Sequence, residues 1–178
     1  TIVGIVERAK IIDGKNVQPG NVLIGFGSNG LHTNGYSLAR KVLFEKYSVT
    51  DKPDNFENSI GEELLKVHKS YLKLIKNISD KINVKAFSHI TGGGIMGNTM
   101  RVVPKGMSLD INWSAWELPK IFKLIQNTGE ISDEEMRKAF NLGIGLITIV
   151  DKNDIDAVVS IAKDENQSSY IIGEVVDS

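Results

Sequence analysis

Short apolar runs that predict β-strands alternate along this chain with segments of helical periodicity, and this alternation is the feature that most constrains the fold. The clearest buried strand is residues 22–26. The clearest amphipathic helix starts after residue 35, where apolar side chains recur every three or four positions. About five to seven strands and five helices in mixed order predict an α+β fold. We expect a mixed β-sheet with helices packed on both faces, in three α/β/α layers.

Several element boundaries carry local signals. S-x-x-E capping boxes at residues 59–62 and 132–135 each predict the start of a helix, and the first of these helical stretches is expected to break near residues 68–70. Gly129 is expected to stop the helix that precedes the second box. Residues 2–12 alternate loosely between apolar and charged side chains and predict one or two short strands. Further strands are expected at residues 84–89, 107–111, 143–150 and 170–176.

The charge balance excludes two classes of partner. The 178 residues include 21 Lys plus Arg and 22 Asp plus Glu, a formal net charge of −1. A nucleic-acid binder or a polybasic membrane-surface protein would carry a basic excess, so neither partner is expected. No apolar run reaches the ~18 residues that a membrane helix needs. A hydrophobic fraction of 41% predicts a folded core, and the length predicts a single domain over residues 1–178.

Cysteine is absent, which removes disulfides, thiolate nucleophiles and cysteine-containing zinc sites, and fits a reducing compartment. The chain has three histidines, His32, His68 and His89, far apart in the sequence and outside any H-x-x-x-H pattern. We therefore expect no metal site. His68, beside Lys69, is expected on the surface, and His89 precedes a glycine turn whose pocket it could line.

The most polar loop of the chain lies at residues 27–35, between the buried strand and the amphipathic helix. It overlaps a G-x-G-x-x-G pattern at residues 25–30, but five further residues precede the helix, so a dinucleotide site is not expected. Backbone N–H groups and the helix start favour an anion or amide ligand here. The alternative is that Thr33 or Asn34 only caps the helix. Side chains that could bind a ligand are His32, Thr33, Asn34 and Ser37.

Two more glycine-containing segments are candidate sites. Gly92, Gly93 and Gly94 follow a strand and precede a helix, with Asn98 and Arg101 one and two turns further on. Three glycines exceed what a tight turn needs, which favours a ligand close to the backbone. The alternative is a tight turn in which the glycines only supply positive φ. If strands 22–26 and 84–89 are neighbours, this turn and the 27–35 loop open on the same sheet edge. Asn141, before two further glycines, is either a helix cap or part of a flat binding face.

Three segments of the chain resemble one family, that of aminoimidazole ribonucleotide synthetase, also called phosphoribosylformylglycinamidine cyclo-ligase. Residues 27–38, G-S-N-G-L-H-T-N-G-Y-S-L, resemble its signature [GS]-S-x-G-x-H-[ST]-N-G-Y-S-L. Residues 89–94, H-I-T-G-G-G, with Asn98 and Arg101, are similar to its H-[IL]-T-G-G-G…N-x-x-R segment. Residues 136–145 are similar to its M-x-x-x-F-N-x-G-x-G segment. The chain departs from the family pattern at Gly97, Met100, Ala139 and Val67-His68-Lys69.

The resemblance covers nearly the whole chain but only the C-terminal half of that two-domain, ATP-dependent enzyme. The family's N-terminal half carries a D-G-[VA]-G-T-K signature for ATP and metal, which this sequence lacks. The resemblance therefore implies an isolated second domain, inactive alone, and the abrupt start at Thr1 fits a piece of a longer protein. ATP and Mg²⁺ would be bound mainly by the missing half. The implied full-length enzyme is a cytoplasmic homodimer.

The implied activity is the ATP-dependent ring closure of formylglycinamidine ribonucleotide to aminoimidazole ribonucleotide, in de novo purine biosynthesis. We expect His32 to act catalytically on the reacting amide. The expected substrate-binding residues are Ser28, Asn34, Ser37, Gly92, Gly93, Gly94, Asn98, Arg101 and Asn141. Two alternatives remain: a non-catalytic module that binds a ligand or partner, and the matching domain of a related ATP-using enzyme such as formylglycinamidine ribonucleotide synthetase.

Overall fold

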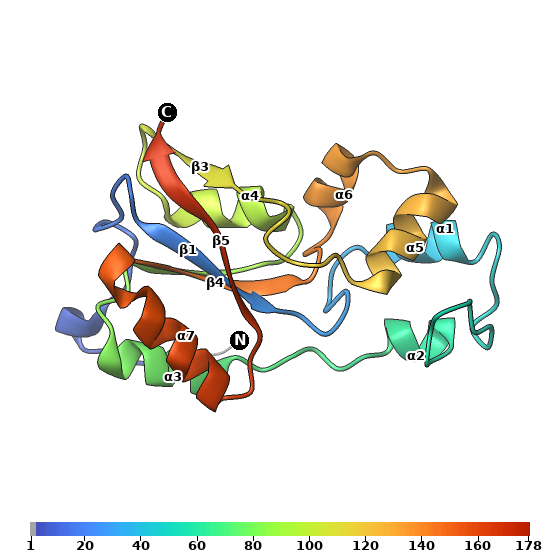
Figure 1. Ribbon diagram of the computed structural model, residues 1–178, viewed down its shortest axis with the longest axis horizontal. Helices are drawn as coiled ribbons and strands as arrows, with labels where there is room; N and C mark the ends of the chain where they lie inside the picture. Colours follow the sequence, from blue (N-terminus) through green and yellow to red (C-terminus); the bar gives the residue numbers. More distant parts are fainter. Residues whose placement is uncertain (1–2) are drawn as a thin grey trace.

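The computed structural model describes residues 3–178, which fold around one five-stranded sheet (Figure 1). The strand order is β2-β4-β1-β5-β3, so no two strands adjacent in the sheet are consecutive in the chain. The central strands β1 and β4 are fully buried. The strands are β1 (Val22–Gly27), β2 (Ala86–His89), β3 (Met107–Ile111), β4 (Ile144–Val150) and β5 (Ser169–Asp177).

The helices are short, and most begin at a polar cap or a glycine. Over residues 3–178 they are α1 (Tyr36–Leu43), α2 (Ile60–Leu64), α3 (Leu72–Lys81), α4 (Gly94–Thr99), α5 (Lys120–Gly129), α6 (Asp133–Ala139) and α7 (Ile155–Asp164). Three 3₁₀ turns accompany them, η1 (Arg8–Lys10), η2 (Met100–Val102) and η3 (Lys152–Asp154).

Helices pack on both faces of the sheet. On one face, Leu74 and Ile78 of α3 and Ile161 of α7 pack against alternate side chains of β1. On the other face, Ile95 of α4 packs against Leu23 of β1 and its neighbours. Alternation along a strand sends successive side chains to opposite faces, which is why one strand serves both layers. The predicted α/β/α layering is confirmed.

A second group of helices extends beyond the end of the sheet, where α1, α2, α5 and α6 form the right-hand part of Figure 1. Their shared core includes Leu43 from α1, Ile60 from α2, Phe122 from α5 and Phe140 after α6. The rings of Phe122 and Phe140 lie 5.7 Å apart between centroids. Leu31, from the loop between β1 and α1, is part of the same core, so the helical group anchors that loop.

The predicted α+β class is confirmed, but the prediction that strand directions are mixed is wrong. All four strand pairs in the sheet are antiparallel. The prediction also fails at the start of the chain. Residues 3–12 contain the turn η1 and no strand, and residue 2 lies outside the described part. Val3, Ile5 and Val6 are exposed, so the apolar pattern there is not buried against the sheet.

The local boundary signals are largely confirmed. Ser59 accepts a hydrogen bond from the Glu62 amide while the Glu62 carboxylate accepts one from the Ser59 amide, a complete capping box. At the second box, the Ser132 hydroxyl accepts from the Glu135 amide. The predicted break is present, because no helix or strand covers residues 65–71. The residue that ends α5 in the left-handed conformation is Glu130, not the expected Gly129.

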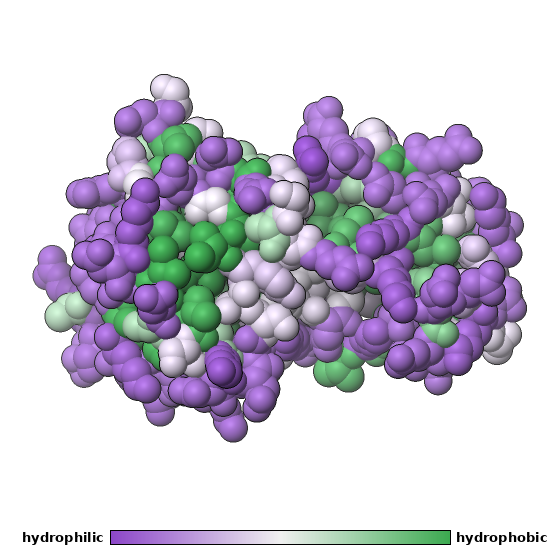
Figure 2. Space-filling model, in the orientation of Figure 1, coloured by the Kyte–Doolittle hydropathy of each residue, from purple (hydrophilic) through white to green (hydrophobic). Residues whose placement is uncertain are grey.

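The surface of the molecule is mostly polar, with one apolar area over the sheet that is visible in Figure 2. A shallow hollow near β5 is lined by Val22, Ile155 and Ile171, and the Ile171 side chain is half exposed. Among residues 3–178 there is no helix with both the length and the apolar character needed to cross a membrane.

Candidate functional site

Two of the segments singled out by sequence lie together at one edge of the sheet. The prediction of this meeting from the sequence depended on β1 and β2 being neighbours. They are not neighbours, because β4 lies between them. Both are antiparallel to β4, so they run in the same direction and end at the same edge. There the Asn34 side chain lies beside Gly92: a Cβ added at Gly92 would lie 3.6 Å from Asn34 Oδ1.

The loop after β1 is held by a buried amide from a distant segment. Asn141 Nδ2 donates to the Gly30 carbonyl at 2.9 Å, and Asn141 Oδ1 accepts from the Ser28 hydroxyl at 2.9 Å and from the Gly143 amide at 2.8 Å. All of these contacts are internal to the protein. Ser28 and Asn141, both expected to bind substrate, therefore shape the loop; a direct contact with substrate stays a prediction.

Asn98 plays the same part for the glycine turn. Its Nδ2 donates to the carbonyl of Gly94 at 2.7 Å and of Thr91 at 3.1 Å, and its Oδ1 accepts from the Thr91 hydroxyl at 2.9 Å. The Gly93 amide donates to the Lys138 carbonyl and the Gly94 amide to the Thr91 carbonyl. These two amides are thus already paired. A phosphate would have to rely on other groups of the turn.

Five expected binding residues present groups that are at least partly accessible at this edge. Gly92 and Gly93 are exposed, and Arg101 lies beside Gly93, where an added Cβ would come within 3.9 Å of the guanidinium Nη2. Ser37 is exposed on the first turn of α1 and Asn34 is half-buried before it. These groups can meet a ligand that approaches the sheet edge from solvent.

His32 is the most constrained residue of the loop. It is only 3% exposed and adopts a left-handed backbone conformation with φ of 56°. Its Nε2 lies 3.0 Å from Asn29 Oδ1, and its Nδ1 is buried with no hydrogen-bond partner among residues 3–178. Burial above all, and then the nearby His68, His89 and Lys69, lowers the pKa of His32 to about 4. The imidazole is neutral near pH 7.

The structure brings all three histidines of the chain together, which the sequence did not indicate. The rings of His32 and His68 stack with centroids 4.0 Å apart, and His68 Nε2 lies 3.3 Å from His89 Nε2. His68, expected on the surface, is half-buried in the stretch between α2 and α3 that has no helix or strand. His89 does lie at this site. No periodicity or spacing marks His68, because its position depends on how residues 65–71 cross the sheet edge.

The low pKa of His32 predicts a pH-dependent stability. In the unfolded chain a histidine has a pKa near 6.5, whereas the pKa of folded His32 is about 4. Between these two pH values the unfolded state is protonated at this residue and the folded state is not, so protons favour unfolding. The free energy of unfolding should therefore be highest above pH 6.5 and should decrease as the pH drops from 6.5 to 4. Urea unfolding at pH 7, 6 and 5, with NMR titration of the imidazole, measures this.

His32→Asn is the matched variant for this experiment, because asparagine tolerates the left-handed backbone and does not titrate in this range. Its stability should fall less between pH 6.5 and pH 4 than that of the unchanged chain. An imidazole of His32 that titrates near pH 6.5 would contradict the burial described here.

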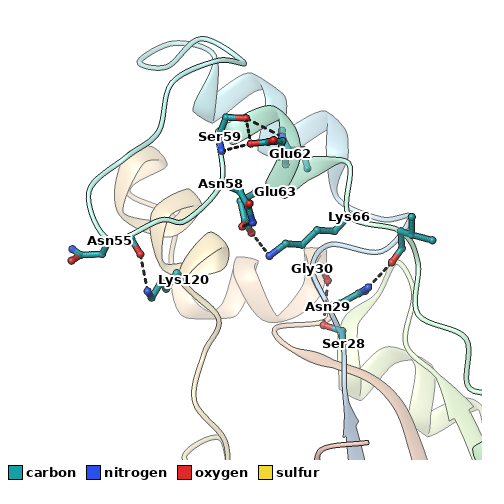
Figure 3. Close-up of polar contacts among 12 residues, drawn as sticks. Ser28, Asn29, Gly30, Asn55, Asn58, Ser59, Glu62, Glu63, Lys66 and Lys120 are labelled. Atoms are coloured by element: carbon teal, nitrogen blue, oxygen red, sulfur yellow. Dashed lines mark hydrogen bonds and ion pairs between the residues drawn. The ribbon is translucent and has the colours of Figure 1, made fainter. Parts of the chain in front are cut away.

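A polar cavity of about 530 Å³ lies on the other side of the 28–30 loop. Figure 3 shows it between that loop, α2 and the start of α5, with Lys66 and Lys120 reaching toward it. Lys66 Nζ pairs with Glu63 Oε2 at 2.7 Å, and Asn58 Nδ2 donates to Glu63 Oε1 at 2.9 Å. The buried carboxylate is thus fully engaged, which gives the cavity a balanced charge.

The residues at this edge do not fit a magnesium ion. Mg²⁺ prefers carboxylate and water oxygens in an octahedral arrangement. The site offers imidazoles, amides and hydroxyls, and the cavity carboxylate of Glu63 is occupied by Lys66 and Asn58.

Curated relatives match nearly the whole chain. A phosphoribosylformylglycinamidine cyclo-ligase of Alkaliphilus oremlandii is 42% identical over 177 residues, covering 98% of this chain and 52% of that protein. One of Syntrophus aciditrophicus is 43% identical over 175 residues, covering 97% of this chain and 50% of that protein. The chain therefore spans about half the length of the curated relatives it matches.

Solved structures share the fold at low sequence identity. Thiamine-monophosphate kinase from Stenotrophomonas maltophilia matches with a TM-score of 0.60 at 12% identity, over 97% of this chain and 52% of that one. E. coli HypE, a hydrogenase maturation protein, matches with a TM-score of 0.59 at 19% identity, over 93% and 46%. T. maritima PurL complexed with AMPPCP matches with a TM-score of 0.57 at 14% identity, over 97% and 24%.

These solved structures establish the fold, and the family follows from the sequence model that matches. That model, described as AIR synthase related protein, C-terminal domain, matches residues 18–178, which include every strand of the sheet and the whole candidate site. The chain belongs to the family of AIR synthase related protein C-terminal domains.

Proposed function

We propose that this chain is the C-terminal half of a phosphoribosylformylglycinamidine cyclo-ligase. The observation that carries the proposal is the identity of 42% over 98% of the chain to a relative of that name. The geometry agrees with it, because the loop with His32 and the turn with Arg101 come from separate parts of the chain and meet at one sheet edge. A ligand at that edge can contact both.

The proposed reaction closes an imidazole ring in purine biosynthesis. The γ-phosphoryl group of ATP passes to the formyl oxygen of formylglycinamidine ribonucleotide, which leaves ADP. The nitrogen that closes the ring then attacks the formyl carbon, the carbon–oxygen bond breaks and inorganic phosphate leaves, with loss of a proton. Catalysis of such a transfer rests mainly on positioning and on stabilising charge.

In this proposal, His32 acts on the formyl group, and exposed groups at the same edge hold the substrate. A neutral imidazole can donate a hydrogen bond through one nitrogen and accept a proton at the other. Asn34 and Ser37 would contact the substrate, and Arg101 would hold a phosphate beside Gly93. Ser28, Asn98 and Asn141 would keep the loop and the turn in shape for it.

The remaining parts of the activity are proposed to lie outside this chain. ATP and Mg²⁺ would be bound mainly by an N-terminal half like that of the relatives. The two halves would form one wall each of a shared cleft. The complete enzyme is proposed to be a homodimer of the cytoplasm with a small-molecule substrate.

Reconstitution of the cleft tests this proposal. We would fuse the chain in frame behind the N-terminal half of the Alkaliphilus oremlandii relative, and measure ADP and aminoimidazole ribonucleotide formed from ATP and formylglycinamidine ribonucleotide. Neither half alone should turn over, and the fusion should. His32→Asn in the fusion should lower kcat by at least about 100-fold, the lower end for loss of an acid–base group.

Lys105→Ala, exposed just before β3 at the opposite edge of the sheet, is the matched control and should leave kcat unchanged. A folded fusion that binds the ribonucleotide but releases no ADP would contradict the proposed cyclo-ligase activity. It would indicate that this domain is a ligand-binding module without activity. Turnover of FGAR, the compound bound in a T. maritima PurL structure, in place of formylglycinamidine ribonucleotide would instead identify a domain of the related synthetase.

A further inference from the structure

All three histidines of this chain meet at one point although they come from three separate segments. His32 lies in the loop after β1, His68 in the stretch between α2 and α3, and His89 at the end of β2. One ring nitrogen of each lies within 4.8 Å of those of the other two. Three histidines placed at random would seldom lie so close together, so the cluster is a candidate binding site.

We propose that His32, His68 and His89 bind a divalent transition-metal ion of the zinc type. Imidazole nitrogen is a preferred ligand of zinc, copper and nickel, and three histidines with an open fourth position are an established zinc coordination. The ion would be distinct from the Mg²⁺ of the proposed reaction, since imidazoles are poor magnesium ligands. It shares His32 with that reaction, so the two roles exclude each other: with the ion bound, His32 would have no nitrogen free to act on the formyl group.

The distance between two of the nitrogens already suits an ion. Nitrogens bound at about 2.0–2.1 Å to a tetrahedral zinc ion lie about 3.3–3.4 Å apart. His68 Nε2 and His89 Nε2 are 3.3 Å apart. Without an ion, this separation fits a weak hydrogen bond between the two rings, in which a proton takes the place of the metal.

The surroundings of His32 supply the second observation. Metal-ligating histidines usually give their other ring N–H to a carbonyl or carboxylate, which fixes the ring. His32 Nε2 lies 3.0 Å from Asn29 Oδ1 and 3.4 Å from the Asn29 backbone amide. In the tautomer with the proton on Nε2, the ring donates to Oδ1 and Nδ1 is the nitrogen with a free lone pair. Asn29 Nδ2 is itself held by the Val67 carbonyl at 2.6 Å. The opposite nitrogen, Nδ1, is buried and without a partner among residues 3–178. A buried unpaired nitrogen is costly, and an ion would satisfy it.

Binding requires one ring to turn. A metal ion lies in the plane of each imidazole that binds it, whereas His32 and His68 now stack with 21° between their planes. His68 is the ring that can move, because it is half-buried and lies in a stretch without helix or strand. Lys69 is the charged neighbour, with its Nζ 3.1 Å from the Gly27 carbonyl, and its charge lowers the affinity for a cation.

Zinc titration of the chain without an affinity tag tests the site. We expect one zinc ion per chain by calorimetry, and a raised melting temperature at saturating zinc, because the ion binds only the folded state. With Co²⁺ as the probe, visible absorption bands should report nitrogen coordination of low symmetry. An excess of Mg²⁺ should displace neither ion.

Variants at the surface-facing ligands separate this site from adventitious binding. His68→Ala and His89→Ala should each lower zinc affinity at least tenfold while near-ultraviolet dichroism stays unchanged. Lys69→Ala is the matched neighbour: it removes charge but no ligand, so affinity should stay the same or rise. No saturable zinc binding, or binding unaffected by both histidine variants, would overturn the proposal. Because no turnover is measured, this outcome is independent of the proposed cyclo-ligase activity.

Discussion

Gly94→Ala should lower the melting temperature of this domain by roughly 10 °C. Gly94 is buried and has φ of 65°, a backbone conformation that costs an alanine about 1 kcal/mol or more. Its added Cβ would also overlap the carbonyl oxygen of Arg137, which is backbone and cannot turn away. We expect a total loss of about 3–5 kcal/mol, and a domain of this size loses about 2–4 °C per kcal/mol.

The physical reason is the close approach of two helices at the candidate site. The start of α4 lies against the end of α6, where the Gly93 amide donates to the Lys138 carbonyl at 3.1 Å. A side chain at Gly94 would push these backbones apart and break that bond. The glycine is thus needed for packing, whether or not a ligand also approaches the turn.

Gly97→Ala is the matched control, three residues along the same helix. Gly97 is exposed, and a Cβ there would meet nothing within 4 Å. Alanine favours the helix over glycine by up to about 1 kcal/mol, so this variant should melt at the same or a higher temperature. Thermal denaturation of both variants checks the pair. Equal melting temperatures would contradict the close packing of α4 on α6.

Asn141→Ala should cost about 3 kcal/mol and loosen the loop that carries His32. The change leaves the buried Gly143 amide without its partner at 2.8 Å, and leaves the buried Gly30 carbonyl with only the Ser28 hydroxyl at 3.2 Å in place of the amide donor at 2.9 Å. Each unsatisfied buried group costs about 1–3 kcal/mol. Urea unfolding measures the loss, and hydrogen exchange of the amides over residues 28–35 should become faster than in the unchanged chain.

Two further variants set the scale for the loss of stability in Asn141→Ala: Ser28→Ala should lose less, and Asn83→Ala is the control. Ser28 gives Asn141 one hydrogen bond, so its removal should cost about 1 kcal/mol. Asn83 is exposed in a loop, and its replacement should change the stability by less than about 0.5 kcal/mol. If Asn141→Ala is no more damaging than Asn83→Ala, the asparagine does not hold the loop.

The sequence alone determined the parts of the fold that depend on neighbours in the chain. The capping boxes at Ser59 and Ser132 place two helix starts, because a hydroxyl and an amide three residues apart satisfy each other locally. The strands β1 and β4 follow from their apolar runs, since such a run must be buried whatever surrounds it. The glycines at 92–94 likewise marked a turn between a strand and a helix, and Gly93 and Gly94 have the positive φ that was the alternative to a ligand there.

The candidate site was only half visible in the sequence. The polar loop and the glycine turn were found because glycines and polar residues mark them. That Asn98 and Asn141 hold these segments internally was not visible, since an asparagine that binds backbone carbonyls and one that binds a ligand look alike in a sequence. Their distances to Gly94 and Gly30 are what assign the internal contacts.

Only the tertiary structure decided the strand directions, the fate of residues 3–12 and the meeting of the histidines. Strand direction depends on how each connection crosses the sheet. Residues 3–12 can form a strand only by pairing with a sheet edge, and the structure does not pair them with one. His32, His68 and His89 come together because β1 and β2 end at the same edge and residues 65–71 pass across it. Contacts between segments so distant in sequence are set by burial of the whole core, and no local pattern encodes them.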